Sequence, residues 1–251
     1  LNLPDRSRVQ TLVAEHTTIA RLAARFDPTA DDTLDMLLDA VHYDRDTLDL
    51  LEVLTEADAR ATGPGVWNAR LESGLRTLVD RARRALVPAT PLRPHVHAPE
   101  QLTLRRDGDV VTIAARGHDP RGILALLVAK AWKLSAVRIV GEHAEYDARP
   151  TVEKLDDLDT GAFIQAHKSG VHTAVPVPPP APTWLSWHGQ VLEVRTGVRV
   201  GALAALLGVL PEFEWLSLTT PGATMIVHVS LPGVVDRRKV DRDVTRVLGN
   251  G

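Results

Sequence analysis

The sequence predicts an α+β protein in which an all-helical segment is followed by two βαββα units. Three observations predict this class. Apolar residues recur at helical spacing over residues 1–87, and strand-like runs replace them further along the chain. Two Pro-rich linkers, residues 88–100 and 174–184, separate the segments. The order strand, glycine turn, helix, strand, strand, helix then occurs twice, in residues 101–173 and 185–251.

Composition excludes several classes of protein. Of the 251 residues, 44% are hydrophobic and 24% are charged, which is typical of globular domains. A net charge of −3 lacks the basic footprint of a nucleic-acid binder. The absence of cysteine excludes disulfide scaffolds, thiolate zinc sites and cysteine nucleophiles, and it is compatible with a reducing cytoplasm, where we expect the protein. No run of eighteen apolar residues and no signal peptide occurs, so we expect no membrane partner.

The helical segment is expected to hold four helices. Pro4 and Asp5 suit the first turn of a helix, and one apolar stripe then runs from Val9 through His16 to Leu22. Gly63-Pro64-Gly65 is a strong stop signal. The later helices are expected over Leu34–Val41, from Asp44 or Asp46 with Leu48, Leu51, Leu54 and Ala57 on one face, and over Val66–Leu86.

The two repeated units are read from their apolar runs. The first is expected to have strands at Val110–Ala114 and Ala136–Val140, a turn at Asp119–Gly122, and helices at Ile123–Leu134 and Thr160–Lys168. The second is expected to have strands at Val191–Arg195, Trp215–Leu218 and Met225–Val229, a turn at Gly197–Gly201, and helices at Ala202–Leu207 and Val234–Leu248. Units of this order form an antiparallel sheet with both helices on one face, the ferredoxin-like arrangement.

One stretch carries a resemblance to a known family. The run from Leu54 to Asn68, L-T-E-A-D-A-R-A-T-G-P-G-V-W-N, resembles the end of the HD domain of bacterial PII uridylyltransferases. The segment Leu12-Val13-Ala14-Glu15-His16 is similar to the family's helix ending in a paired histidine, with Glu15 replacing the first. An Arg-rich helix, a linker and two units that resemble ACT domains follow. The whole chain therefore resembles the C-terminal part of the bifunctional PII-protein uridylyltransferase/uridylyl-removing enzymes.

The resemblance implies a role in nitrogen regulation. In that family an N-terminal nucleotidyltransferase attaches a nucleotide to the PII signal protein, the HD domain removes it, and ACT domains respond to glutamine. Whether UMP or AMP is transferred stays open. This chain has no G-S-x-x-D signature and no His and His-Asp pair, so we expect it to be inactive alone. A stand-alone ACT module that senses another amino acid, and an active HD phosphohydrolase, are the alternatives.

The resemblance also implies a metal ligand. An HD site brings imidazole nitrogens and carboxylate oxygens onto divalent metals, Mg or Mn in the full-length enzyme, which activate water. Asp58 matches the last acidic ligand, and the other ligands are expected upstream of Leu1. The alternative is a surface or capping aspartate. His16 is more often a packed, hydrogen-bonded core residue than a ligand, and His95 and His97 are expected to be exposed linker residues.

The two strand-to-helix turns are the candidate effector sites. Asp119-Pro120-Arg121-Gly122 resembles the D-x-P-G turn of ACT domains, where bare amides at a helix start attract a carboxylate and glycine permits close approach. We expect Asp119, Arg121 and Gly122 to contribute to a glutamine site. Arg199 and Gly201 of the second turn, which lacks the acid, either meet an effector carboxylate or only close the turn. Ligand-free turns are the alternative for both.

Overall fold

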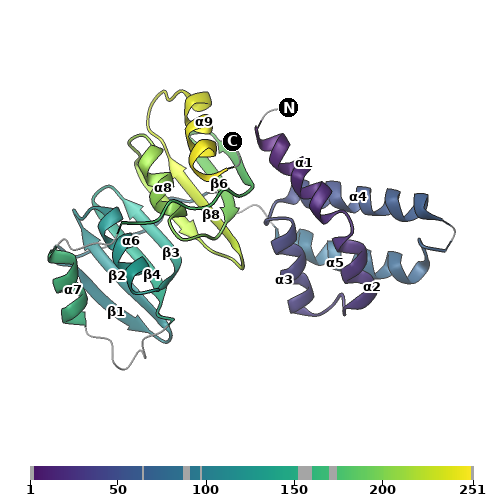
Figure 1. The fold of residues 1–251 in the computed structure, drawn as a ribbon, viewed down its shortest axis with the longest axis horizontal. Helices are drawn as coiled ribbons and strands as arrows, with labels where there is room; N and C mark the ends of the chain where they lie inside the picture. Colours follow the sequence, from purple (N-terminus) through teal and green to yellow (C-terminus); the bar gives the residue numbers. More distant parts are fainter. Residues whose placement is uncertain are drawn as a thin grey trace. The chain divides into compact units, whose positions relative to one another are not determined.

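The computed structural model describes residues 3–63, 65–86, 91–96, 98–151, 160–169 and 174–249. The chain separates into two compact units, one made of the N-terminal helices and one made of a sheet with its helices (Figure 1). The predicted α+β class is confirmed. No helix in the described residues combines the length and the apolar character that a membrane span requires.

The helical unit packs around leucine and isoleucine side chains that are fully buried. Its core residues include Ile19, Leu22, Leu37, Leu51 and Leu78, each with no exposed surface. The helices are α1 (Leu3–Glu15), α2 (Thr18–Arg25), α3 (Asp31–Ala40), α4 (Arg45–Thr62) and α5 (Ala69–Ala85). The apolar face predicted for α5 is confirmed, because Leu75, Leu78, Val79 and Ala82 are buried.

The single first helix predicted from Pro4 to Leu22 is wrong, because the chain forms α1 and α2 with a break at residues 16–17. The hydroxyl of Thr18 donates to the Glu15 carboxylate at 2.6 Å, a local bond of the kind that competes with helix continuation. Val9 and Val13 are 45% and 69% exposed. The regular apolar spacing thus continues across the break, although on α1 Val9 and Val13 are exposed and Leu12 packs against the core.

Helix α4 begins after Asp44, the first of the two predicted starts. The Asp44 carboxylate accepts hydrogen bonds from the amide of Thr47 at 2.9 Å and from its hydroxyl at 2.5 Å, which caps the helix. The predicted inward face is only partly right, because Leu54 is 38% exposed and Ala57 is exposed too. Ala59 lies in the interior instead. The buried stripe therefore rotates slightly from the predicted one.

The sheet unit contains an eight-stranded sheet of order β1-β2-β4-β3-β7-β8-β6-β5. Its first half consists of β1 (Thr103–Asp107), β2 (Val110–Arg116), α6 (Pro120–Ala129), β3 (Lys133–Val140), β4 (His143–Arg149) and α7 (Thr160–Lys168). Its second half consists of β5 (Thr183–His188), β6 (Val191–Gly197), α8 (Ala202–Val209), β7 (Trp215–Thr219), β8 (Thr224–Ser230) and α9 (Arg237–Leu248).

Each half therefore has the order ββαββα, one strand more than the predicted βαββα. The added strands β1 and β5 form antiparallel hairpins with β2 and β6. Strand β5 includes Thr183 and Trp184, which were predicted to belong to the linker. The predicted helix to Leu134 is too long, since α6 ends at Ala129 and Leu134 belongs to β3. Ala131, with φ of 54°, lies in the turn between the two elements.

The two halves join through the antiparallel pairing of β3 with β7, in which Ile139 is opposite Leu216. Alternate strand residues enter one apolar core, to which α6, α7, α8 and α9 all contribute buried side chains. The opposite side chains of the same strands are polar and half-buried. They include Arg138 with Glu145 and Asp147 in the first half, and Arg195 with Glu193 and His228 in the second.

Candidate functional site

The first strand-to-helix corner is built around Asp119, the residue before α6. Its carboxylate accepts a hydrogen bond from the Arg121 amide at 3.0 Å, and its carbonyl accepts one from the Gly122 amide at 3.1 Å. Pro120 occupies the first helical position, where its missing N–H is not needed. The amides expected to be bare thus already have partners, and an incoming carboxylate would have to displace the cap.

Opposite charges remain available at this first corner. The side chains of Asp119 and Arg121 are exposed, and neither forms an ion pair with another described residue. One terminal nitrogen of Arg121 lies 3.8 Å from the position that a Cβ on Gly208 would take, so the side chain reaches α8 of the second half. A carboxylate and a guanidinium at one helix start match the ammonium and carboxylate groups of an α-amino acid.

A second set of polar side chains surrounds this corner, and sequence reasoning missed it. Tyr146 on β4 is 1% exposed, and its hydroxyl has no hydrogen-bond partner among the described side chains and backbone. Burial, together with the negative charge of Asp119, raises the Tyr146 pKa. His118 Nδ1 lies 3.0 Å from Nε2 of His167 on α7. Only the position of His118, directly before Asp119, could have signalled this group from sequence.

The second corner is covered by the chain itself. Gly201 has φ of +87°, and a Cβ added there would overlap the carbonyl oxygen of Pro176 in the Pro-rich linker. The space that a ligand would use beside this glycine therefore holds linker backbone. Glycine is required here both for the left-handed conformation and for this close approach.

Arg199 also binds the chain's own backbone. Its guanidinium donates to the carbonyls of Gly197 at 3.2 Å, Leu248 at 3.1 Å and Pro179, and to the Thr196 hydroxyl at 2.7 Å. Burial lowers the Arg199 pKa, and no carboxylate of the described residues pairs with it. Arg199 thus ties the linker and the end of α9 to the second corner, so the two corners are unlike.

The predicted metal ligand, Asp58, belongs to the helical unit. Asp58 is exposed on α4, and its backbone carbonyl accepts the Thr62 hydroxyl at 2.7 Å. No group of three or more His, Cys, Asp or Glu side chains in the described part of the chain could hold a metal. His16 is hydrogen-bonded to the Val13 carbonyl at 2.9 Å but is exposed, so the expected packing is wrong. His95 is exposed as expected, and His97 lies outside the described residues.

The chain is therefore an α+β protein of two compact units. A helical unit comes first in the sequence, and it is followed by a sheet unit whose two halves repeat the same order of strands and helices. Over nearly its whole length this chain is homologous to bifunctional uridylyltransferase/uridylyl-removing enzymes, so the resemblance to that family is confirmed.

Three relatives illustrate the similarity. The Corynebacterium glutamicum enzyme is 48% identical over 252 residues, which cover 99% of this chain and 36% of that protein. The Mycobacterium tuberculosis enzyme is 27% identical over 309 residues, 99% of this chain and 38% of its own length. The Streptomyces coelicolor enzyme is 32% identical over 46% of this chain. The chain thus spans little more than a third of the first two relatives, in their C-terminal part.

No family model matches the chain. No solved structure matches it either.

Proposed function

We propose that this chain is the C-terminal regulatory portion of a PII nucleotidyltransferase/nucleotidyl-removing enzyme in nitrogen regulation. The observation that supports this most is the similarity over 99% of the chain to a bifunctional enzyme at 48% identity. The helical unit then corresponds to the end of an HD domain, and the two ββαββα halves correspond to ACT domains. The PII protein is the macromolecular partner in this proposal.

Glutamine is the proposed effector, and the first corner is its proposed site. The exposed Asp119 carboxylate would face the ammonium group, and the exposed Arg121 guanidinium would face the carboxylate. The Tyr146 hydroxyl, which has no hydrogen-bond partner among the described residues, offers a further polar group, since the charge of Asp119 acts on it. Gly122 leaves the helix start without a side chain at its third position. The second corner takes no effector in this proposal, because Pro176 covers Gly201.

Asp58 would contribute to catalysis only in the full-length enzyme. A lone exposed carboxylate does not hold Mg²⁺ or Mn²⁺, so Asp58 would act together with ligands outside residues 1–251. We therefore expect the 251-residue chain, purified alone, neither to add a nucleotide to PII nor to remove one. Phosphodiesterase turnover that Asp58→Ala abolishes would contradict this expectation.

Calorimetric titration of the 251-residue chain with glutamine tests the effector site. We expect binding that Asp119→Asn and Arg121→Gln each weaken about tenfold, because each removes one charge-assisted hydrogen bond. Arg105→Gln is the matched control, since Arg105 is an exposed arginine on β1 that lies away from both corners in sequence and forms no ion pair with a described residue. Binding that only the control weakens would refute the site.

In the full-length enzyme, Gly122→Val should weaken the glutamine response while leaving nucleotide addition and removal intact. The alternative function is a stand-alone ACT module that senses another amino acid and has no catalytic partner in its chain. Heat from another amino acid, with none from glutamine, would favour that alternative. An unchanged glutamine response in Gly122→Val would remove the first corner from the proposal.

A further inference from the structure

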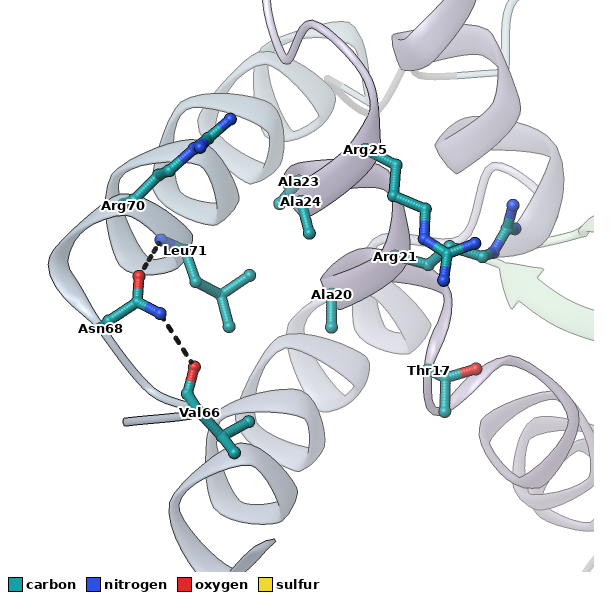
Figure 2. Close-up of a pocket in the computed structure, with 10 residues that line it drawn as sticks. All are labelled: Thr17, Ala20, Arg21, Ala23, Ala24, Arg25, Val66, Asn68, Arg70 and Leu71. Carbon is teal, nitrogen blue, oxygen red and sulfur yellow. Dashed lines mark hydrogen bonds between the residues drawn. The ribbon is translucent and has the colours of Figure 1, made fainter. Parts of the chain in front are cut away.

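The helical unit contains a hollow of about 610 Å³ between α2 and the start of α5 (Figure 2). This volume falls within the range of small-molecule sites. Its walls combine short apolar side chains with positively charged ones. The lining residues are Thr17, Ala20, Arg21, Ala23, Ala24, Arg25, Val66, Asn68, Arg70 and Leu71.

Three arginines around this hollow are uncompensated. Arg21 and Arg25 lie four residues apart on α2, where like charges face each other and repel. Figure 2 shows Arg70, from α5, across the hollow from them. Within the described residues none of the three makes a side-chain hydrogen bond or an ion pair. Arginines of this unit that do pair with carboxylates are Arg8, Arg45, Arg60, Arg76, Arg81 and Arg83. The positive charge thus remains unneutralised mainly around the hollow.

The start of α5 does not account for this charge. The Asn68 side-chain oxygen accepts the Leu71 amide at 3.0 Å, and its nitrogen donates to the Gly65 and Val66 carbonyls at 3.1 and 3.4 Å. Figure 2 shows the first and last of these bonds at the edge of the hollow. The helix end is therefore capped by its own side chain, and the attraction for an anion comes from the guanidinium groups.

We propose that this hollow binds a small organic phosphate monoester. A phosphate monoester carries a charge of about −1.5 to −2 at pH 7, more than a single carboxylate, and suits the guanidiniums of Arg21 and Arg25, which lie one helical turn apart on α2. A phosphate alone would leave most of the 610 Å³ unfilled. The organic part packs against apolar side chains on both sides of the hollow, Ala20 and Ala24 from α2 and Leu71 from α5. This site goes beyond the effector proposal, which concerns only the sheet unit.

Calorimetric titration of the 251-residue chain tests the site with uridine monophosphate and adenosine monophosphate, each beside its nucleoside, and with inorganic phosphate. We expect at least one monophosphate to bind more tightly than both its nucleoside and inorganic phosphate. The double variant Arg21→Gln/Arg25→Gln should weaken that binding at least about tenfold, because two charged hydrogen-bond donors are lost. Adding salt should weaken it as well.

Arg84→Gln is the matched control, since Arg84 is an exposed arginine on α5 that does not line the hollow and has no ion-pair partner among the described residues. It should leave the affinity unchanged, and far-ultraviolet circular dichroism should show that every variant keeps its helices. The proposal is overturned if neither monophosphate binds, if nucleoside or inorganic phosphate binds as tightly, or if the control weakens binding equally. Glutamine titration in the same double variant should be normal, which separates this site from the effector site.

Discussion

At the scale of single residues, Gly201 shows how a strand-to-helix turn can serve as a packing contact for another part of the chain. Its left-handed φ of +87° and the Pro176 carbonyl beside it leave no room for a side chain. Gly122, at the equivalent turn of the first half, instead lies in the first turn of α6, where the neighbouring Asp119 and Arg121 are exposed. Glycine at the second corner thus permits the linker backbone to pack closely, whereas glycine at the first corner follows charged side chains that are exposed.

Gly201→Ala should destabilise the sheet unit by more than the 1–2 kcal/mol or so that a left-handed alanine costs alone. The added methyl group would overlap the Pro176 carbonyl and would displace the linker that Arg199 holds. Urea denaturation measures the loss. Gly233→Ala is the control, since its φ is +72° and no atom lies within 4 Å of the added Cβ. Equal losses in the two variants would mean that the linker contact contributes nothing.

At the scale of elements, strands rich in valine, isoleucine and leucine were easier to predict than a strand with few of these residues. Val110–Ala114 and Met225–Val229 were found from their composition. Strand β4, His143–Arg149, was read as a polar stretch because His143, Glu145 and Asp147 occupy its half-buried positions. Its buried positions are Ala144, Tyr146 and Ala148, a strict alternation that would have identified it.

The candidate site was predictable only in part, and for a related reason. Asp119, Arg121 and Gly122 could be proposed from sequence because they lie within one four-residue segment. Tyr146 and His167 reach the same corner through strand pairing and helix packing, which no local pattern reports. The cover over Gly201 was equally hidden, because a Pro-rich linker gives no sign of the surface on which it lies.

The polar side of the sheet should make stability depend on pH. Burial raises the Glu193 pKa, but hydrogen bonds from His228 and Arg195 outweigh it and lower that pKa to about 2, from an ordinary 4.5. A lowered carboxylate pKa stabilises the fold above pH 4.5, and this stabilisation is lost as pH falls from 4.5 towards 2. The loss should reach about 3 to 4 kcal/mol at most, at about 1.4 kcal/mol for each unit by which the Glu193 pKa is lowered.

Urea denaturation between pH 6 and about pH 2.5 measures this dependence. Glu193→Gln should flatten the acid limb of the stability curve, because the titrating group is gone. Glu142→Gln is the control, since that carboxylate is 73% exposed and, within the described part of the chain, pairs only with Arg116. A curve for Glu193→Gln as steep as that of the unmodified chain would show that the cluster does not determine acid stability.

At the scale of the whole molecule, the chain has two hydrophobic cores of different construction. The helical unit buries leucines from α2 to α5, and the sheet unit buries alternate strand residues beneath four helices. The sequence predicted this division from the change in apolar spacing and from the Pro-rich residues 88–100. It could not predict that β3 and β7 would join the two halves, because strand order depends on contacts distant in sequence.

Two cores predict two separable responses to mutation. Leu78→Ala in the helical unit and Leu216→Ala in β7 each remove a fully buried side chain, which should cost about 2–5 kcal/mol. Amide hydrogen exchange measures the outcome unit by unit. We expect each variant to lower protection in its own unit and to leave the other unchanged. Equal loss in both units for either variant would show that the chain unfolds as one body.

The pairing of β3 with β7 has one further consequence. An edge strand presents unpaired backbone donors and acceptors that invite association with other chains. Because Ala136–Val140 bond to Trp215–Thr219, each half covers the open margin of the other. Because both copies belong to one polypeptide, β3 finds its partner strand β7 within the same chain. An isolated copy would need a second molecule to pair with this edge, whereas here the two copies are always present in a ratio of one to one.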